Sequence, residues 1–167
     1  NAAMLAAWPL NAVQQQADMK EELTMAVWTP DRTFYPTPKQ AMTAPRETLA
    51  YTAVIDPAGR KPDAIVVLDV DPASPSYGKE VGRLDLPYAG DELHHFGWNA
   101  CSAALCPTMP HPHIERRYLV IPGLRSSRMY IADTKGDPRN PQLVKTISPE
   151  EVMKKSGYSR PHTVHCG

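Results

Sequence analysis

The chain has 167 residues, which suits one domain or a piece of a larger one. Lys and Arg number 18, as do Asp and Glu, so the formal net charge is zero and a basic nucleic-acid-binding surface is not expected. No apolar run reaches the length of a membrane span. Eighteen prolines against nine glycines favour short strands joined by stiff loops over long helices.

The two ends of the chain suggest a part of a longer protein. We expect residues 1–24 to be a leader or non-native extension, with Met25 as the natural start; the tail of a signal peptide is the alternative. The last residues, "PHTVHCG", stop inside a His/Cys cluster, so residues 25–167 are expected to be the N-terminal part of an incomplete domain. Three cysteines are an odd number, which disfavours a disulfide framework and indicates a reducing compartment, the cytoplasm, with the periplasm as the alternative.

A unit of short strands occurs twice. The first copy has β-rich runs at residues 47–55, 65–68 and 79–87, and the second has them at 117–124, 129–132 and 142–149. Each copy contains Asp-Pro-x-x-Pro, at 71–75 and 137–141, and Asp-Pro starts turns. The pattern predicts an all-β fold made of β-propeller blades. The copies are farther apart than the ~40–50 residues of a blade, which indicates an insertion around 91–113. Two unrelated hairpins in a small sandwich are the alternative.

A His pair and a cysteine follow each copy. The first set lies in "DELHHFGWNACSAALCP", residues 91–107, and the second in "RPHTVHC". In a propeller these positions are equivalent points of adjacent blades, so the histidines could converge on one ion. Imidazole suits copper, zinc, iron and nickel, and the candidate ligands are His94, His95, His162 and His165. On a regular strand each pair would point apart, so which members ligate stays open.

Other residues near the histidines have candidate roles. Asp91 and Glu92 could hold an imidazole N–H and fix its tautomer. Cys101 is either a reactive or metal-binding thiol or a small buried hydrophobe. Phe96 and Trp98 belong either to the core or to the walls of a small apolar pocket.

Two arginines follow the first strand of the second copy. Arg125 and Arg128 lie in the turn "LRSSR", and we expect them to pair with Asp69 or Asp133 between blades, a structural role that we favour over an anion site.

Long stretches of the chain resemble the selenium-binding protein family, which includes methanethiol oxidases. The resemblance covers roughly residues 25–167 and is carried by "FYPTPKQAMTAPRETLAY", "DELHHFGWNAC", "RRYLVIPGLRSSRMYIADTKGDPRNPQLVKTISPEEV" and "GYSRPHTVHC". The family is built as a seven-bladed β-propeller and is considerably longer, so the resemblance implies that this chain holds its N-terminal blades. The remainder of the propeller would then be needed, and the fragment alone would be inactive.

The resemblance also implies an activity. Family members include copper-dependent oxidoreductases that convert methanethiol, O₂ and water to formaldehyde, hydrogen sulfide and hydrogen peroxide. The family's selenium-binding cysteine carries over to Cys101, and the histidines of the two matching segments are the natural copper ligands. Cys101 and His95 are the implied catalytic residues, and a small thiol and O₂ the implied partners. A selenium or metal carrier without turnover is the alternative.

Overall fold

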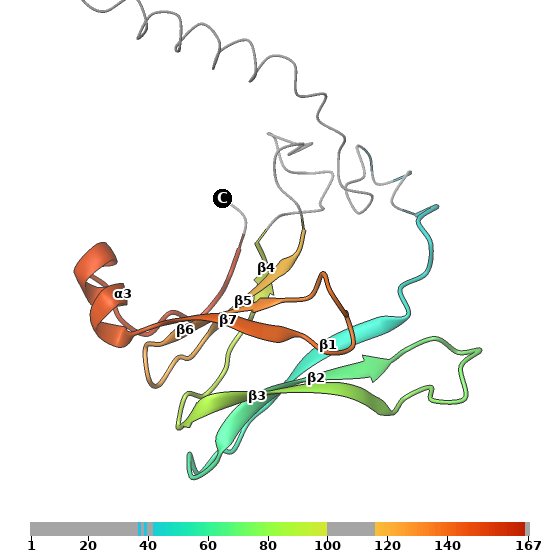
Figure 1. Ribbon diagram of the computed structural model, residues 1–167. Helices are drawn as coiled ribbons and strands as arrows, with labels where there is room; N and C mark the ends of the chain where they lie inside the picture. The colour runs from blue at the N-terminus through green and yellow to red at the C-terminus, as the bar shows by residue number, and fades with distance from the viewer. Residues whose placement is uncertain (1–36, 38, 40–41, 100–115, 166–167) are drawn as a thin grey trace, which may run out of the picture.

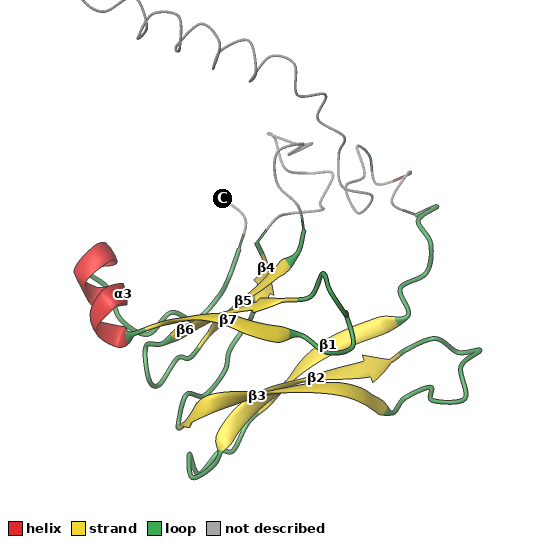
Figure 2. Cartoon of the chain, viewed as in Figure 1, coloured by secondary structure: helices red, strands yellow, loops and turns green. Residues whose placement is uncertain are grey.

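Two antiparallel sheets make up the part of the chain that the structure, a computed structural model, describes: residues 37, 39, 42–99 and 116–165. The first sheet has the order β1 (Leu49–Val54), β2 (Pro62–Asp69), β3 (Glu80–Ala89). The second has the order β4 (Gly97–Trp98), β5 (Tyr118–Pro122), β6 (Met129–Asp133), β7 (Gln142–Ile147), followed by helix α3 (Pro149–Ser156). Figures 1 and 2 show one sheet lying over the other, with α3 beyond the end of β7. The all-β prediction is confirmed, and the arrangement of the sheets as propeller blades stays a prediction.

The hydrophobic core lies between the two sheets. Strand β2 carries the β-branched run of residues 65–67, a composition that suits a buried strand. Ile65 is opposite Ala53 on β1 and Leu84 on β3, which fixes the register of the first sheet. The buried core combines residues of both sheets and of the connection between them: Ile65, Leu86, Leu93, Leu119, Ile121, Tyr130 and Ala132. Burial of this shared apolar surface therefore holds the sheets together.

Both Asp-Pro-x-x-Pro stretches form the same turn, as the repeat predicts. In the first, Asp71 accepts hydrogen bonds from Ala73 N at its side chain and from Ser74 N at its carbonyl. In the second, Asp137 accepts from Arg139 N and Asn140 N in the same way. An Asp side chain that bonds the backbone two residues on is a common turn device. The two copies are thus alike in local structure as well as in sequence.

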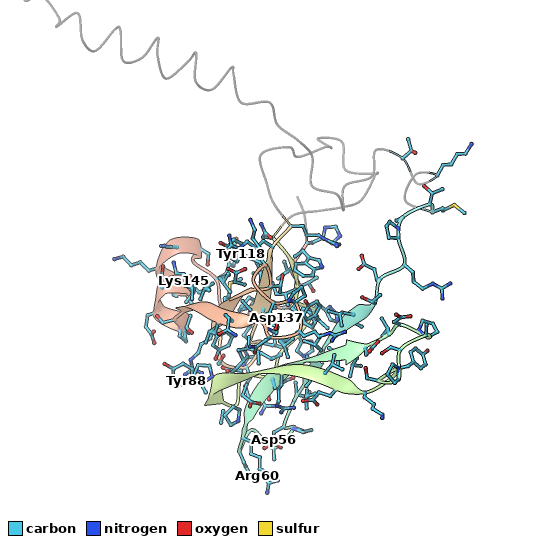
Figure 3. All side chains as sticks on the ribbon, turned by 45° about the vertical axis from the view of Figure 1, so that its right-hand side comes forward. Asp56, Arg60, Tyr88, Tyr118, Asp137 and Lys145 are labelled. Carbon is cyan, nitrogen blue, oxygen red and sulfur yellow. The ribbon has the colours of Figure 1, made fainter. Side chains whose placement is uncertain are left out.

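The second copy's turn packs directly on the first sheet. Tyr51 Oη donates a hydrogen bond of 2.7 Å to the carbonyl of Pro138. A Cβ added at Gly82 on β3 would lie 1.5 Å from the carbonyl oxygen of Arg139, which no side chain could tolerate. Figure 3 labels Asp137, the residue that starts this turn. Glycine at position 82 therefore lets the backbones of the two copies approach closely.

The expected pairing of Arg125 and Arg128 with Asp69 or Asp133 is wrong. The carboxylate of Asp69 accepts hydrogen bonds from the hydroxyls of Ser74 and Ser76, both at 2.5 Å, in the turn that follows β2. These bonds, that of Ser74 first, lower the pKa of Asp69.

Asp133 pairs instead with an arginine of its own sheet. The register places Asp133 opposite Tyr118, so Arg117 meets it across β5 and β6. The bond from Arg117 lowers the pKa of Asp133 to about 2. Each aspartate is thus satisfied within its own copy.

Helix α3 and the short strand β4 were not predicted. The signals for the helix are in the sequence: Ser148 caps its N-terminus by accepting a hydrogen bond from Glu151 N at 3.2 Å. Pro149 occupies the first turn, and Gly157 ends the helix in the left-handed conformation with φ of 74°. Among the described residues, the structure contains no helix with the length and apolar character needed to cross a bilayer.

Gly82→Ala tests the close packing of the two copies. The added methyl would force the carbonyl of Arg139 away, and such overpacking costs about 1–3 kcal/mol. We expect a clear fall in the thermal midpoint measured by circular dichroism. Gly136→Ala is the matched control, because a Cβ there meets nothing within 4 Å. Equal midpoints for the two variants would contradict the packing described.

Candidate metal centre

His94 and His95 lie in the connection between the two sheets. Just before them, Leu93 forms an isolated bridge with Gly123, and its N–H donates to the buried Asp63 carboxylate at 3.1 Å. His94 N donates to the carbonyl of Pro122 at 3.1 Å. The two histidines precede β4 and belong to no regular strand, so the alternation that would point neighbouring side chains apart does not apply.

His162 reaches the same place from the other end of the described chain. After α3, the backbone N–H of Arg160 donates to Ser127 Oγ at 2.9 Å. Both residues are in the left-handed region, with φ of 56° for Arg160 and 65° for Ser127. Val164 N then donates to the carbonyl of His95 at 3.0 Å, which joins the last described segment to the connection before β4 (Figure 1).

Three imidazoles converge as a result. His94, His95 and His162 each offer a ligand nitrogen, and the three nitrogens lie within 4.8 Å of one another. The ring centroids of His94 and His95 are 4.5 Å and 4.7 Å from that of His162. Three neutral imidazoles that leave further positions open form a donor set that suits copper or zinc. His165 is exposed and lies outside this group.

The two acidic residues differ in their contacts. Glu92 Oε1 lies 3.4 Å from His94 Nε2, while Arg125 holds the other oxygen of Glu92 at 2.6 Å. The bond with His94 and then that with Arg125 lower the pKa of Glu92. A carboxylate at Nε2 favours the tautomer with its proton there, which leaves His94 Nδ1 free to ligate.

Asp91 faces the core instead. It is fully buried, and its two oxygens accept hydrogen bonds from Arg128, at 2.9 Å, and from Tyr130. Burial, and then the bond with Asp91, raise the pKa of Tyr130. In the described structure it is therefore Glu92 that meets an imidazole, and Asp91 anchors the turn that carries Arg128.

The supporting roles of three residues at the site were not predicted from the sequence: Arg125, Ser127 and Thr163. Thr163 Oγ1 lies 2.8 Å from His162 Nδ1 and 3.3 Å from His95 Nδ1. The position of Thr163 within "HTVH" was the one available signal. The roles of Arg125 and Ser127 depend on contacts between distant segments, which leave no local pattern.

A cavity of about 640 Å³ lies between β1 and the strands β4 and β5, and none of the three clustered histidines lines it. Phe96 and Trp98 line it and also pack against the hydrophobic core, so each of the two interpretations of these residues holds in part. Its walls are not purely apolar, because Arg116, Arg117 and Lys135 also line it.

The predictions for the cysteines and the N-terminus lie outside the described residues. Cys101, Cys106 and Cys166 all fall in the parts that the structure does not describe, as do residues 1–24. A role for Cys101 at the histidine cluster therefore stays a prediction.

Known proteins match most of the chain. The family model "56kDa selenium binding protein" matches residues 28–167. Selenium-binding protein 2 of Arabidopsis thaliana is 49% identical over 134 residues, 79% of this chain and 27% of that protein. A methanethiol oxidase of Danio rerio is 42% identical, with 79% and 28% covered. The chain therefore belongs to the 56kDa selenium binding protein family and spans about a quarter of the length of these relatives.

A solved structure matches the fold. It is an X-ray structure of a hypothetical selenium-binding protein from Sulfolobus tokodaii, with a TM-score of 0.75 and 60% sequence identity. The match covers 82% of this chain and 30% of that one.

Ser127→Ala tests how the segment carrying His162 is held. Loss of the hydroxyl removes the acceptor for Arg160 N, so amides of residues 158–165 should exchange faster by hydrogen–deuterium exchange mass spectrometry. Ser126→Ala is the control, because its hydroxyl accepts from Arg128 N within its own turn. Unchanged exchange at 158–165 in the Ser127 variant would show that this hydrogen bond does not hold the segment.

Proposed function

We propose that this protein is a copper-dependent methanethiol oxidase, of which the chain forms the N-terminal blades of a seven-bladed β-propeller. The reaction would convert methanethiol, O₂ and water to formaldehyde, hydrogen sulfide and hydrogen peroxide. The observation that carries the proposal is the convergence of three imidazoles from two distant segments. Relatives named methanethiol oxidase, at 42–43% identity, support this chemistry over others that such a centre could serve.

The residues present fit a copper ion. His94, His95 and His162 would hold it through neutral imidazole, a ligand that suits copper. When bound, copper supplies one-electron redox chemistry and favours the thiolate form of a sulfur ligand. Three protein ligands leave room for substrate beside them, and residues of the remaining propeller would complete and enclose the site.

This chain's own residues would orient the ligands. Glu92, fixed by Arg125, would accept the Nε2 proton of His94 and hold that ring in one tautomer. His95 is exposed, and its part in catalysis would be to hold copper where methanethiol can reach it. We assign Cys101 a part in catalysis on the resemblance alone. The proposal places the protein in the cytoplasm, with the periplasm as the alternative.

A selenium or metal carrier without turnover is the second candidate function. Its support is the relatives named selenium-binding protein, at 46–49% identity. In that function Cys101 would be the soft ligand for selenium, and the imidazoles would contribute little to its capture.

Single and double substitutions in the natural full-length protein separate the two. We expect His94→Ala, His95→Ala and His162→Ala each to lower copper affinity. Loss of a residue that only supports a metal ligand typically lowers affinity about 10–100-fold, so loss of a ligand itself should lower it at least as much. Double variants should add little, since residues that act as one unit fail together. Copper content, selenium content and O₂ uptake with methanethiol are the measurements.

Two further variants complete the design. His165→Ala is the matched control and should retain copper, because His165 lies outside the three-imidazole group. Cys101→Ala should retain copper and lose turnover only in part in an oxidase, whereas in a carrier it should abolish selenium binding. Full copper occupancy and full turnover in all three cluster variants would refute the oxidase proposal.

A further inference from the structure

Thr163 lies between two of the clustered imidazoles and contacts both. Its Oγ1 is 2.8 Å from His162 Nδ1 and 3.3 Å from His95 Nδ1. The backbone sets this position, because the next residue, Val164, donates its N–H to the carbonyl of His95 at 3.0 Å. One hydroxyl thus meets the same nitrogen of two rings that come from segments far apart in the chain.

The proton count of a hydroxyl restricts what these two contacts can be. A threonine hydroxyl has one hydrogen to donate and two lone pairs that accept. If Thr163 donates to one Nδ1, that neutral ring carries its own proton on Nε2, and neither nitrogen can bind a metal while the contact lasts. If Thr163 accepts from both rings, each ring has its proton on Nδ1 and an unprotonated Nε2.

We propose, building on the metal centre proposed above, that Thr163 is a positioning residue whose hydroxyl accepts a hydrogen bond from Nδ1–H of both His95 and His162. Both rings then present Nε2 to the same ion. His94 differs, because Glu92 lies at its Nε2 and leaves Nδ1 to ligate. The centre is therefore of mixed type, with two rings bound through Nε2 and one through Nδ1.

The hydroxyl also couples the two segments. His162 is carried by a stretch held by the Ser127–Arg160 and His95–Val164 hydrogen bonds, and Thr163 adds a side-chain link to His95 within it. Removing that link frees two rings to rotate at once. Groups that hold the second nitrogen of a ligating histidine typically contribute about 10–100-fold to metal affinity.

Thr163→Val tests this role in the natural full-length protein, because valine keeps the shape and removes the hydroxyl. We expect copper to bind about 10–100-fold more weakly, by competition with a chelator of known affinity. Thr163→Ser, which keeps a hydroxyl, should restore binding. Thr52→Val, on β1, is the matched control and should bind copper as the wild type does.

A spectroscopic measurement reports on the tautomers independently of activity. In protein with ¹⁵N-labelled histidine, loaded with diamagnetic Zn²⁺, long-range ¹H–¹⁵N spectra should show protonated Nδ1 and metal-bound Nε2 for His95 and His162. His94 should show the reverse.

The outcomes separate this inference from the proposed function. Wild-type affinity in Thr163→Val, or ligation through Nδ1 of His95 or His162, would overturn the role of Thr163 and leave the metal centre standing. A wild-type protein that binds neither copper nor zinc would overturn both.

Discussion

The buried carboxylate of Asp63 joins the two sheets. One oxygen accepts the N–H of Asp56, in the turn between β1 and β2, and the other accepts the N–H of Leu93, in the connection to the second sheet. A buried backbone N–H left without an acceptor costs about 1–3 kcal/mol, so this side chain strongly favours one path for the chain. That path ends one residue before His94, so the position of the candidate metal centre depends on a contact inside the core.

The three imidazoles are anchored unequally. His94 is half-buried and follows a residue fixed by Asp63 and by the bridge to Gly123. His162 is exposed and reaches the cluster through a stretch that passes a residue with positive φ, Arg160. The approach of His162 to the other two rings therefore depends on a few hydrogen bonds between distant segments. Ser127 and Thr163 supply such bonds from outside the core.

Much of the fold could be predicted from the sequence, because its signals are local. The strands follow from β-rich runs such as residues 65–67, and both turns follow from Asp-Pro chemistry, in which a side chain bonds its own backbone. Helix α3 has local signals of the same kind in Ser148, Pro149 and Gly157, although it was not predicted. The partners of Arg125 and Arg128 were not predictable, because they lie across the connection between the sheets.

The candidate site was predictable only in part, because its residues come from segments that are distant in the sequence. A His pair follows each copy in the sequence, but the sequence could not tell which members meet. That choice depends on irregular backbone: His94 and His95 share one cluster because they lie outside a regular strand, and His162 joins it through the positive φ of Arg160. Conformations of this kind arise from tertiary contacts and leave little trace in residue order.

The charges around the centre bear on what it can bind. The one carboxylate that contacts the cluster, among the described residues, is Glu92, and its charge is already balanced by Arg125 at 2.6 Å. Three neutral imidazoles do not offset the charge of a metal cation either. If a metal cation is bound here, an anionic ligand is therefore favoured at its open positions, because the nearby carboxylate of Glu92 is already paired with Arg125. A thiolate is one such anion, so the charge of the centre is compatible with the proposed oxidation of methanethiol and with the proposed carrier function alike, and turnover distinguishes the two.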